Sequence, residues 1–189
     1  MKNSLFIISG PSGAGEDCVI EGLRDYFPIE RVITSTTRKI RQGESQGDPY
    51  YFISSEEFQK GLEKDEFFEY AKEYNDKYYG VTNKEIERVK EIDKLGIWKV
   101  EYKGVMTINK KMPNVKSILI SAPIEVLEGR LKKRGNISDQ AIRERTEYTK
   151  EWYKHKDVYN YEVVNEEGKL DETIKKVADI IKKELNIDN

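Results

Sequence analysis

The sequence has very few of the residues that build covalent cross-links and structural metal sites. It contains one cysteine, Cys18, and one histidine, His155. A lone cysteine excludes an intramolecular disulfide, and the two residues together are too few for a zinc site of the usual ligand count. This usage fits a reducing interior. We therefore expect a cytoplasmic protein in which Cys18 is a small core residue.

Long hydrophobic runs and an excess of one charge are also missing. The apolar stretch Leu5 to Ile8 ends at Ser9, far short of a secretory signal or a membrane span. Charged residues make up 36% of the chain, but the net charge is only −2. Nothing in this balance indicates a nucleic-acid or membrane partner. With 189 residues, the chain is expected to form one folding unit that acts on a small molecule or a protein.

What is present is a glycine-rich loop directly after the first apolar run. Residues Ser9 to Cys18 place four residues between Gly10 and Gly15, as in a phosphate-binding P-loop, but Glu16 and Asp17 follow where that motif has lysine and then serine or threonine. The glycines supply backbone N–H groups for phosphate, whereas the missing lysine and hydroxyl would neutralise phosphate and hold magnesium. The protein is therefore either a disabled enzyme or a rewired one.

The order of apolar segments predicts an α/β chain with a parallel sheet. Strands are expected at Leu5–Ile8, Ile97–Val100, Ser117–Ile120 and Tyr161–Val164. Helices are expected from the loop to Pro28, at Asn83–Lys94, in two parts of Val126–Lys154, and at Leu170–Leu185. The segment from Thr34 to Tyr79 is rich in tyrosine, glycine and charge, and it predicts a small mixed lobe.

Further short motifs occur in a fixed order along nearly the whole chain. They are Thr34-Ser35-Thr36-Thr37-Arg38, Arg41, Gly43-Glu44, Gly47, Tyr50-Tyr51-Phe52, Phe68-Glu69-Tyr70-Ala71, Tyr78-Tyr79-Gly80, Arg130-Leu131, Arg134-Gly135, Arg145 and Val164-Asn165. With the loop, this set resembles the guanylate kinase family. The resemblance implies a P-loop nucleoside-monophosphate-kinase fold in one domain, residues 1–189. It comprises a parallel sheet flanked by helices (about 1–33, 95–126 and 156–189), a mixed GMP-binding lobe (about 34–94) and a helical lid (about 127–155).

The resemblance also implies an activity, the transfer of the ATP γ-phosphoryl group to GMP with Mg²⁺ as cofactor. It assigns ATP binding to Gly10, Pro11, Ser12, Gly13, Ala14, Gly15, Glu16, Asp17 and Asn165. It assigns GMP binding to Thr34, Arg38, Arg41, Tyr50, Glu69, Tyr79, Thr82 and Glu101. The catalytic arginines of the lid would be Arg130, Arg134 and Arg145. The expected partners are the nucleotides ATP and GMP, bound by a monomer or a homodimer.

The residue types on the GMP side agree with this chemistry. Arg38 and Arg41 are suited to hold a phosphate dianion with phenol donors such as Tyr50 and Tyr79, although two solvated arginines are the plainer alternative. Glu69 lies among aromatic residues and is expected to be partly buried. Its carboxylate would accept hydrogen bonds from guanine N1–H and N2, which adenine cannot match, and a surface glutamate is the alternative.

Two features bear on specificity and on rate. The family usually has a serine at the position of Val81, and valine cannot donate a hydrogen bond to guanine. Thr82 is the candidate substitute for that donor. A nucleoside-monophosphate kinase with an altered base preference is therefore an interpretation beside the guanylate kinase and the non-catalytic module. The lid arginines would stabilise charge on the transferring phosphoryl group. On charge pattern alone, the same region reads as a solvated helix with internal ion pairs.

A second departure from the family lies in the predicted strand near Ile97. Where the family has two acids followed by glutamine, this chain has Lys99, Glu101 and Lys103. The loop has lost a lysine and this strand has gained one, which makes Glu16 and Lys99 candidates for an exchanged ion pair. Our hypothesis is that Lys99 has a catalytic role by supplying the missing charge, and that Asp17 is the metal ligand for Mg²⁺.

Other interpretations of the two loop acids stay open. Carboxylates in the first turn of a helix stabilise it without any role in catalysis. Alternatively, they repel the nucleotide, and the chain is a non-catalytic guanylate-kinase-like module that binds phosphopeptides or nucleotide. The retained lid arginines and the single-domain length favour the enzyme.

Overall fold

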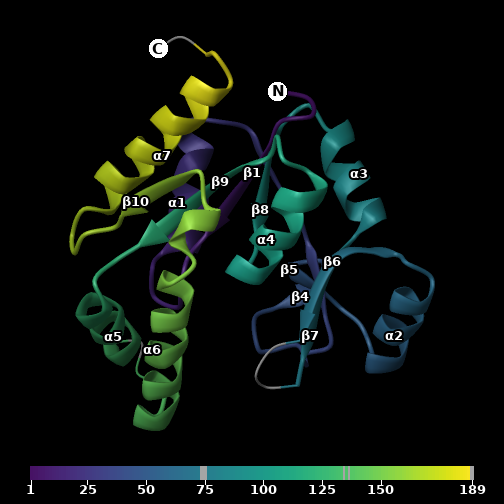
Figure 1. Cartoon of the computed structure of the whole chain (residues 1–189), viewed down its shortest axis with the longest axis horizontal. Coiled ribbons are helices and arrows are strands. Elements are labelled where there is room, and N and C mark those ends of the chain that lie inside the picture. The colour runs from purple at the N-terminus through teal and green to yellow at the C-terminus, as the bar shows by residue number, and fades with distance from the viewer. Residues whose placement is uncertain (73–75, 134, 136, 188–189) are drawn as a thin grey trace. The chain divides into compact units, whose positions relative to one another are not determined.

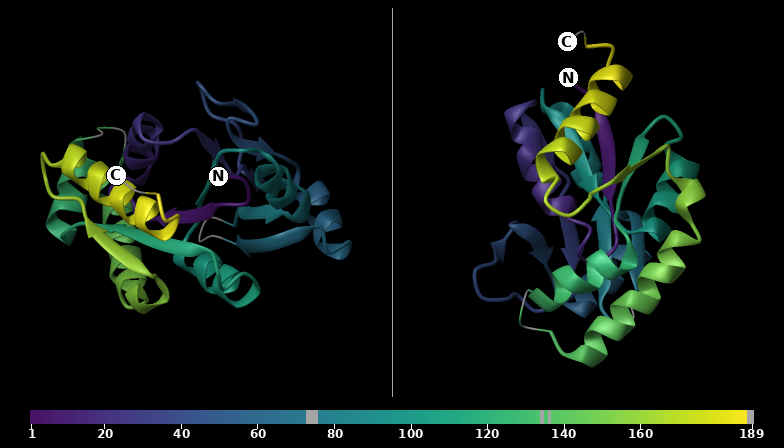
Figure 2. Two further views of the ribbon diagram at one scale, coloured as in Figure 1. Left: turned by 90° about the horizontal axis from the view of Figure 1, so that it is seen from above. Right: turned by 90° about the vertical axis from the view of Figure 1, so that its left-hand side faces the viewer.

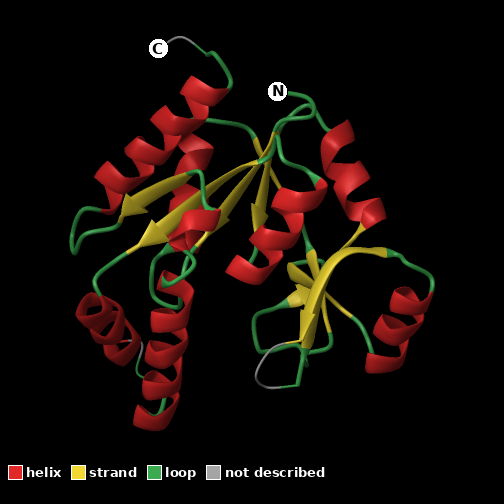
Figure 3. Ribbon diagram, in the orientation of Figure 1, coloured by secondary structure: helices red, strands yellow, loops and turns green. Residues whose placement is uncertain are grey.

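The computed structural model describes residues 1–72, 76–133, 135 and 137–187 (Figure 1). The chain forms two compact units. The first unit comprises Met1–Leu5 and Glu30–Trp98, and the second comprises Phe6–Ile29 and Lys99–Asn189. The predicted α/β architecture is confirmed, with a parallel sheet and a separate mixed sheet among the described residues (Figure 3).

The parallel sheet has the strand order β10-β9-β1-β8-β2. Its strands are β1 (Leu5–Ser9), β2 (Ile29–Arg31), β8 (Leu95–Lys99), β9 (Lys116–Ser121) and β10 (Tyr161–Val164). β9 pairs in parallel with β1 on one side and with β10 on the other, so that Ile8 lies opposite Ile118. Every residue of β1 is buried, as expected for a continuously apolar strand covered on both faces.

The second unit carries most of the helices. They are α1 (Glu16–Gly22), the 3₁₀ helix η1 (Leu23–Asp25), α4 (Tyr102–Lys111), α5 (Ile124–Lys133), α6 (Asp139–Tyr153), η2 (Lys156–Val158) and α7 (Leu170–Glu184). The apolar face of α7, which includes Ile174 and Val177, is buried, and α7 lies beside α1 (Figure 1). α5 and α6 pack side by side in the segment predicted to be a lid (Figure 2).

The expectation for Cys18 was wrong, because its side chain is exposed. α1 buries Val19 and Ile20, and the buried Leu23 continues that face in η1. Cys18 therefore falls on the solvent side of the helix. Free cysteine is generally buried, but here the exposure of residue 18 is set by the face of the helix on which it lies.

The first unit contains the mixed sheet, with the strand order β4-β5-β3-β7-β6. Its elements are β3 (Thr34–Thr36), β4 (Ser45–Gln46), β5 (Pro49–Phe52), α2 (Ser55–Glu63), β6 (Phe67–Lys72), β7 (Tyr78–Thr82) and α3 (Asn83–Glu91). β3 runs parallel to β5 and antiparallel to β7. A small core forms where the rings of Phe58 and Phe67 stack with centroids 4.2 Å apart.

Candidate functional site

The glycine-rich loop has the backbone shape that its sequence predicts. Gly13 and Gly15 both have φ near 92°, a region that favours glycine. A side chain at Gly10 would place its Cβ 2.6 Å from the carbonyl oxygen of Ile120. The loop closes where Ala14 N donates to Pro11 O at 2.9 Å, and α1 then begins at Glu16. The loop thus keeps its form although its charges are reversed.

A buried asparagine holds this loop in place. The side chain of Asn165 is only 4% exposed, and its Nδ2 donates to Ala14 O at 2.8 Å. Its Oδ1 accepts from Thr173 Oγ1 of α7 at 3.2 Å. Ala14 lies 151 positions from Asn165 along the chain, so the sequence indicated only a turn near the nucleotide and not this contact with the loop backbone.

Lys99 lies between the two acids that replace the usual loop residues. Its Nζ is 3.3 Å from Glu16 Oε1 and 2.5 Å from Asp17 Oδ2. The ion pair with Glu16 that the sequence predicted is therefore observed, and the shorter contact is to Asp17. The three residues all belong to the second unit, where they place a cation beside the phosphate loop.

Arg130 of α5 also reaches the loop. Its Nη1 donates to Gly13 O at 3.2 Å and its Nη2 donates to Asn165 O at 3.0 Å, while its Nε pairs with Glu167 Oε2 at 3.1 Å. These bonds explain why the Arg130 side chain is only 19% exposed. Arg145 lies on α6 and is half-buried, whereas Arg134 lies outside the described residues.

In the first unit, the mixed sheet brings three of the predicted GMP-binding residues together. Thr34 lies opposite Tyr50 across the β3–β5 pair, and Tyr79 lies opposite Thr36 across β3–β7. The rings of Tyr50 and Tyr79 meet edge to face with centroids 5.9 Å apart. Residues separated by up to 45 positions in the chain therefore share one sheet surface because of strand pairing.

Arg38 is held by an acid to which the sequence reading assigned no role. Its Nη1 and Nη2 donate to Glu44 Oε2 and Oε1 at 2.9 and 2.8 Å, and its guanidinium lies 5.3 Å from the ring centroid of Tyr50. The hydrogen bonds that Arg38 donates to Glu44 raise the pKa of Arg38 and lower the pKa of Glu44. Glu44 also accepts from the backbone N of the exposed Arg41 at 2.8 Å. The one signal in the sequence is an acid three residues after Arg41.

The structure also places the other three residues that were predicted to bind GMP. Glu69 of β6 is only 5% exposed, as expected for an acid among aromatic residues, and it lies opposite the fully buried Val81. Thr82 caps α3, since its Oγ1 accepts from Glu85 N at 3.2 Å. Glu101 belongs to the second unit, where its Oε2 accepts from Tyr148 Oη of α6 at 2.6 Å.

Comparison with known proteins decides the family. Residues 2–184 match the family model for guanylate kinase. The chain belongs to the guanylate kinase family. The guanylate kinase of Buchnera aphidicola subsp. Baizongia pistaciae is 39% identical over 173 residues, which cover 89% of this chain and 83% of that protein. The guanylate kinase of Haemophilus influenzae (strain 86-028NP) is 38% identical over 189 residues, with coverage of 97% and 89%.

A solved structure of the same family agrees with the fold. The crystal structure of guanylate kinase from Anaplasma phagocytophilum has a TM-score of 0.75 to this chain at 26% sequence identity, and the match covers 97% of this chain and 86% of that one. The guanylate kinase fold is therefore present although the loop lysine is not. Across the described residues, no helix has the length and apolarity that a membrane crossing needs.

Proposed function

We propose that this chain transfers the γ-phosphoryl group of ATP to GMP, giving ADP and GDP, with Lys99 in the place of the missing loop lysine. The observation that carries the proposal is the position of the Lys99 amine, 3.3 Å from Glu16 and 2.5 Å from Asp17. A cation beside the loop supports the idea that the lysine missing from the loop is replaced by Lys99 of the strand. A chain that had lost its activity would not need such a replacement.

On the donor side, the proposal rests on backbone amides and cations. The loop around Gly13 and Gly15 offers N–H groups to phosphate, and Asn165 keeps the loop in that shape. When ATP binds, the Lys99 amine turns from the carboxylates to the phosphate oxygens. Arg130 and Arg145, with Arg134 as a prediction only, stabilise the charge that develops on the transferring group.

The acids at the loop suit a hard divalent cation. Among the described residues there is no cluster of three or more histidine, cysteine or acidic side chains that would bind a metal alone. Mg²⁺ needs no such cluster, because it is usually held by one or two carboxylates together with substrate phosphates. Asp17, with Glu16 beside it, fits this donor set. When bound, Mg²⁺ would neutralise phosphate charge.

On the GMP side, we expect a second cation to exchange a carboxylate partner for a phosphate, as Lys99 does on the ATP side. The bidentate pair of Arg38 with Glu44 keeps the guanidinium oriented, and the GMP phosphate would replace the carboxylate as its partner. Arg41, Tyr50 and Tyr79 would supply further donors. The buried carboxylate of Glu69 would select guanine, with Thr34, Thr82 and Glu101 completing the contacts to GMP.

A coupled assay with ATP and Mg²⁺ tests the proposal, with GMP and AMP as competing acceptors. We expect turnover of GMP and at least ~100-fold less with AMP, since a buried carboxylate without its donors is strongly unfavourable. If AMP is turned over as fast as GMP, the protein is a nucleoside-monophosphate kinase with an altered base preference and not a guanylate kinase. If no nucleotide turns over and a phosphorylated peptide binds instead, the chain is a non-catalytic module.

A further inference from the structure

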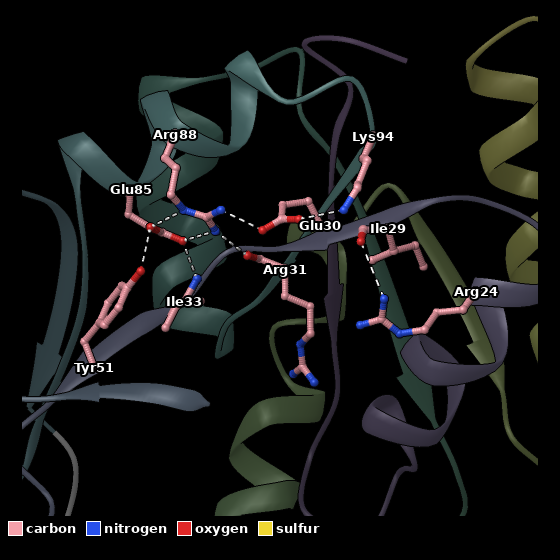
Figure 4. Close-up of polar contacts among 9 residues, drawn as sticks. All are labelled: Arg24, Ile29, Glu30, Arg31, Ile33, Tyr51, Glu85, Arg88 and Lys94. Atoms are coloured by element: carbon pink, nitrogen blue, oxygen red, sulfur yellow. Dashed lines mark hydrogen bonds and ion pairs between the residues drawn. The ribbon is translucent and has the colours of Figure 1, made fainter. Parts of the chain in front are cut away.

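A carboxylate that the sequence motifs do not include lies buried in the first unit. Glu85, on the third position of α3, is only 4% exposed. A charged group buried to this degree needs several donors, because the loss of water is costly. Figure 4 shows that its partners come from three separate segments of the unit.

The carboxylate of Glu85 holds the backbone just before a predicted GMP-binding residue. Its Oε1 accepts from Ile33 N at 2.8 Å, and Ile33 directly precedes Thr34. Its Oε2 lies 3.5 Å from the hydroxyl of Tyr51, which follows Tyr50 on β5. Because β3 and β5 are paired at Thr34 and Tyr50, these two contacts act on the same part of the sheet (Figure 4).

The backbone of Glu85 makes the third contact. Its N–H donates to Thr82 Oγ1 at 3.2 Å, which uses the Thr82 hydroxyl as the cap of α3. Glu85 therefore bonds to Thr82 directly and to the chain neighbours of Thr34 and Tyr50. These are three of the residues assigned to GMP, and Glu85 is not itself among them.

Arg88 orients the Glu85 carboxylate and also binds a second acid, Glu30, so its hydrogen bonds form a network with a Glu85 arm and a Glu30 arm. Its Nε and Nη2 donate to Glu85 at 2.9 and 2.8 Å, and its Nη1 donates to Glu30 Oε1 at 2.6 Å. The hydrogen bonding of Arg88 to the Glu85 carboxylate is the main reason that the pKa of Arg88 is raised. The Glu85 arm points to the acceptor-binding segments, whereas the Glu30 arm ends at β2 and at Lys94 (Figure 4).

We infer that Glu85 is a positioning residue for the acceptor nucleotide, which it serves by fixing the segments that carry Thr34, Tyr50 and Thr82. The inference rests on the proposed function. Glu85 touches no substrate in this role. Its loss acts on GMP through the geometry of its neighbours, while ATP, bound by the second unit, is left unaffected.

The two arms of the network provide a matched experiment. Glu85→Ala removes the acceptor-side arm, and Glu30→Ala removes the other arm of the same arginine. For Glu85→Ala we expect the KM for GMP to rise about tenfold, with kcat and the KM for ATP within about twofold. The variant loses the carboxylate that accepts from Ile33 N and Tyr51 Oη and keeps the backbone N–H that bonds to Thr82. For Glu30→Ala we expect a comparable fall in Tm and an unchanged KM for GMP.

A conservative variant separates positioning from loss of folding. Glu85→Gln keeps an oxygen that accepts from Ile33 N and is expected to restore most of the GMP affinity, measured by calorimetric titration below Tm. Equal changes in the KM for GMP in Glu85→Ala and Glu30→Ala would overturn the inference, as would a parallel loss of ATP affinity. The wild-type protein is assayed first, and an absence of GMP turnover and binding there removes the proposed function itself.

Discussion

Lys99 is held by two carboxylates that occupy the positions of a lysine and a hydroxyl in the usual phosphate loop. The contact distances of 3.3 and 2.5 Å make this a three-residue cluster and not a simple swap of two charges. Asp17 is the more exposed of the two acids, at 56% against 15% for Glu16. Asp17 is therefore the acid better placed to meet a metal from solvent, and Glu16 the one better placed to orient the amine.

Replacing Lys99 tests the cluster at the scale of one residue. Lys99→Met keeps the length of the side chain and removes its charge, and we expect kcat to fall by ~10² to 10³, the usual effect of losing one electrostatic contact to a transition state. The measurement is the steady-state rate with GMP, ATP and Mg²⁺. Lys103→Met, at an exposed lysine of α4, is the control and should retain wild-type activity. Wild-type kcat in Lys99→Met would refute the compensation and leave the kinase assignment standing.

At the scale of elements, α1 and α7 pack closely where a glycine meets an isoleucine. A Cβ on Gly22 would overlap Ile174 Cδ1 and lie 2.9 Å from Ile174 Cγ1. The close approach of the two helices therefore depends on the absence of a side chain at the end of α1. This packing places the first helix after the phosphate loop against the C-terminal helix of the same unit.

Gly22→Ala tests this packing. We expect the free energy of unfolding to fall by ~1 to 3 kcal/mol, the usual cost of an overfilled contact. In a double-mutant cycle, Ile174→Ala should cost less in the Gly22→Ala background than in the wild type. Denaturant unfolding gives all four values. Gly129→Ala on α5 is the control, since nothing lies within 4 Å of its Cβ and alanine favours a helix by up to ~1 kcal/mol. Additive effects of the two substitutions would contradict the proposed overlap.

β2 and α3 are joined by the ion pair of Glu30 with Arg88, and this pair makes stability depend on pH. Burial alone would raise the pKa of Glu30, but hydrogen bonds from Arg88 and Lys94 lower it below its ordinary value of 4.5. Folding therefore favours the ionised carboxylate. Its contribution is present above pH 4.5 and is lost as the pH falls through the lower pKa of the folded state.

Glu30→Gln tests this linkage by comparison with the wild type. We expect the variant to be less stable by ~1 to 2 kcal/mol at pH 7, and the difference to shrink at about pH 3.5, where Glu30 is increasingly protonated. Urea unfolding at the two pH values gives the difference. Glu87→Gln, an exposed acid on the same helix, is the control and should show none. A difference that is constant with pH would show that charge is not its cause.

At the scale of the whole molecule, the residues assigned to the two substrates are divided between the units. Those assigned to ATP lie in the second unit, and those assigned to GMP lie in the first except for Glu101. Because the acids at the loop belong to one unit only, magnesium should affect the binding of the two nucleotides differently.

Removing magnesium tests this division. In a calorimetric titration with a chelator present, we expect ATP to bind at least ~10-fold more weakly, because adjacent carboxylates disfavour bare phosphate, and GMP to bind as before. Asp17→Asn should reduce the dependence of ATP binding on magnesium, whereas Asp25→Asn, at an exposed acid of η1, should not. Tight binding of ATP in the presence of the chelator would contradict the assignment of Asp17 as a metal ligand.

Local patterns were sufficient for the strands β1, β8, β9 and β10 and for the helices α1, α3, α5, α6 and α7. They gave only a mixed lobe for the segment that forms β3 to β7, and they indicated neither β2 nor α4. The ion pair at the loop was expected from the paired charge changes at Glu16 and Lys99. The strand expected at Tyr161–Val164 is β10 with the same bounds, and the apolar run at Leu5 is β1. The sequence could not indicate the bonds of Glu44 to Arg38 or of Glu85 to Ile33. A common surface acid and a buried, fully bonded one look alike in a sequence, because burial depends on what the rest of the chain packs around them.

The sequence by itself determined the family, the phosphate loop and the reversal of its charges, because each of these is carried by residue identity and spacing. Only the tertiary structure decided that Lys99 lies nearer to Asp17 than to Glu16, and that Asn165 and Arg130 bond to the loop backbone. It also decided that the buried Glu85 accepts from Ile33 N and from the hydroxyl of Tyr51. The physical reason is that hydrogen bonds and ion pairs act over about 3 Å, so they exist only where folding brings distant residues together.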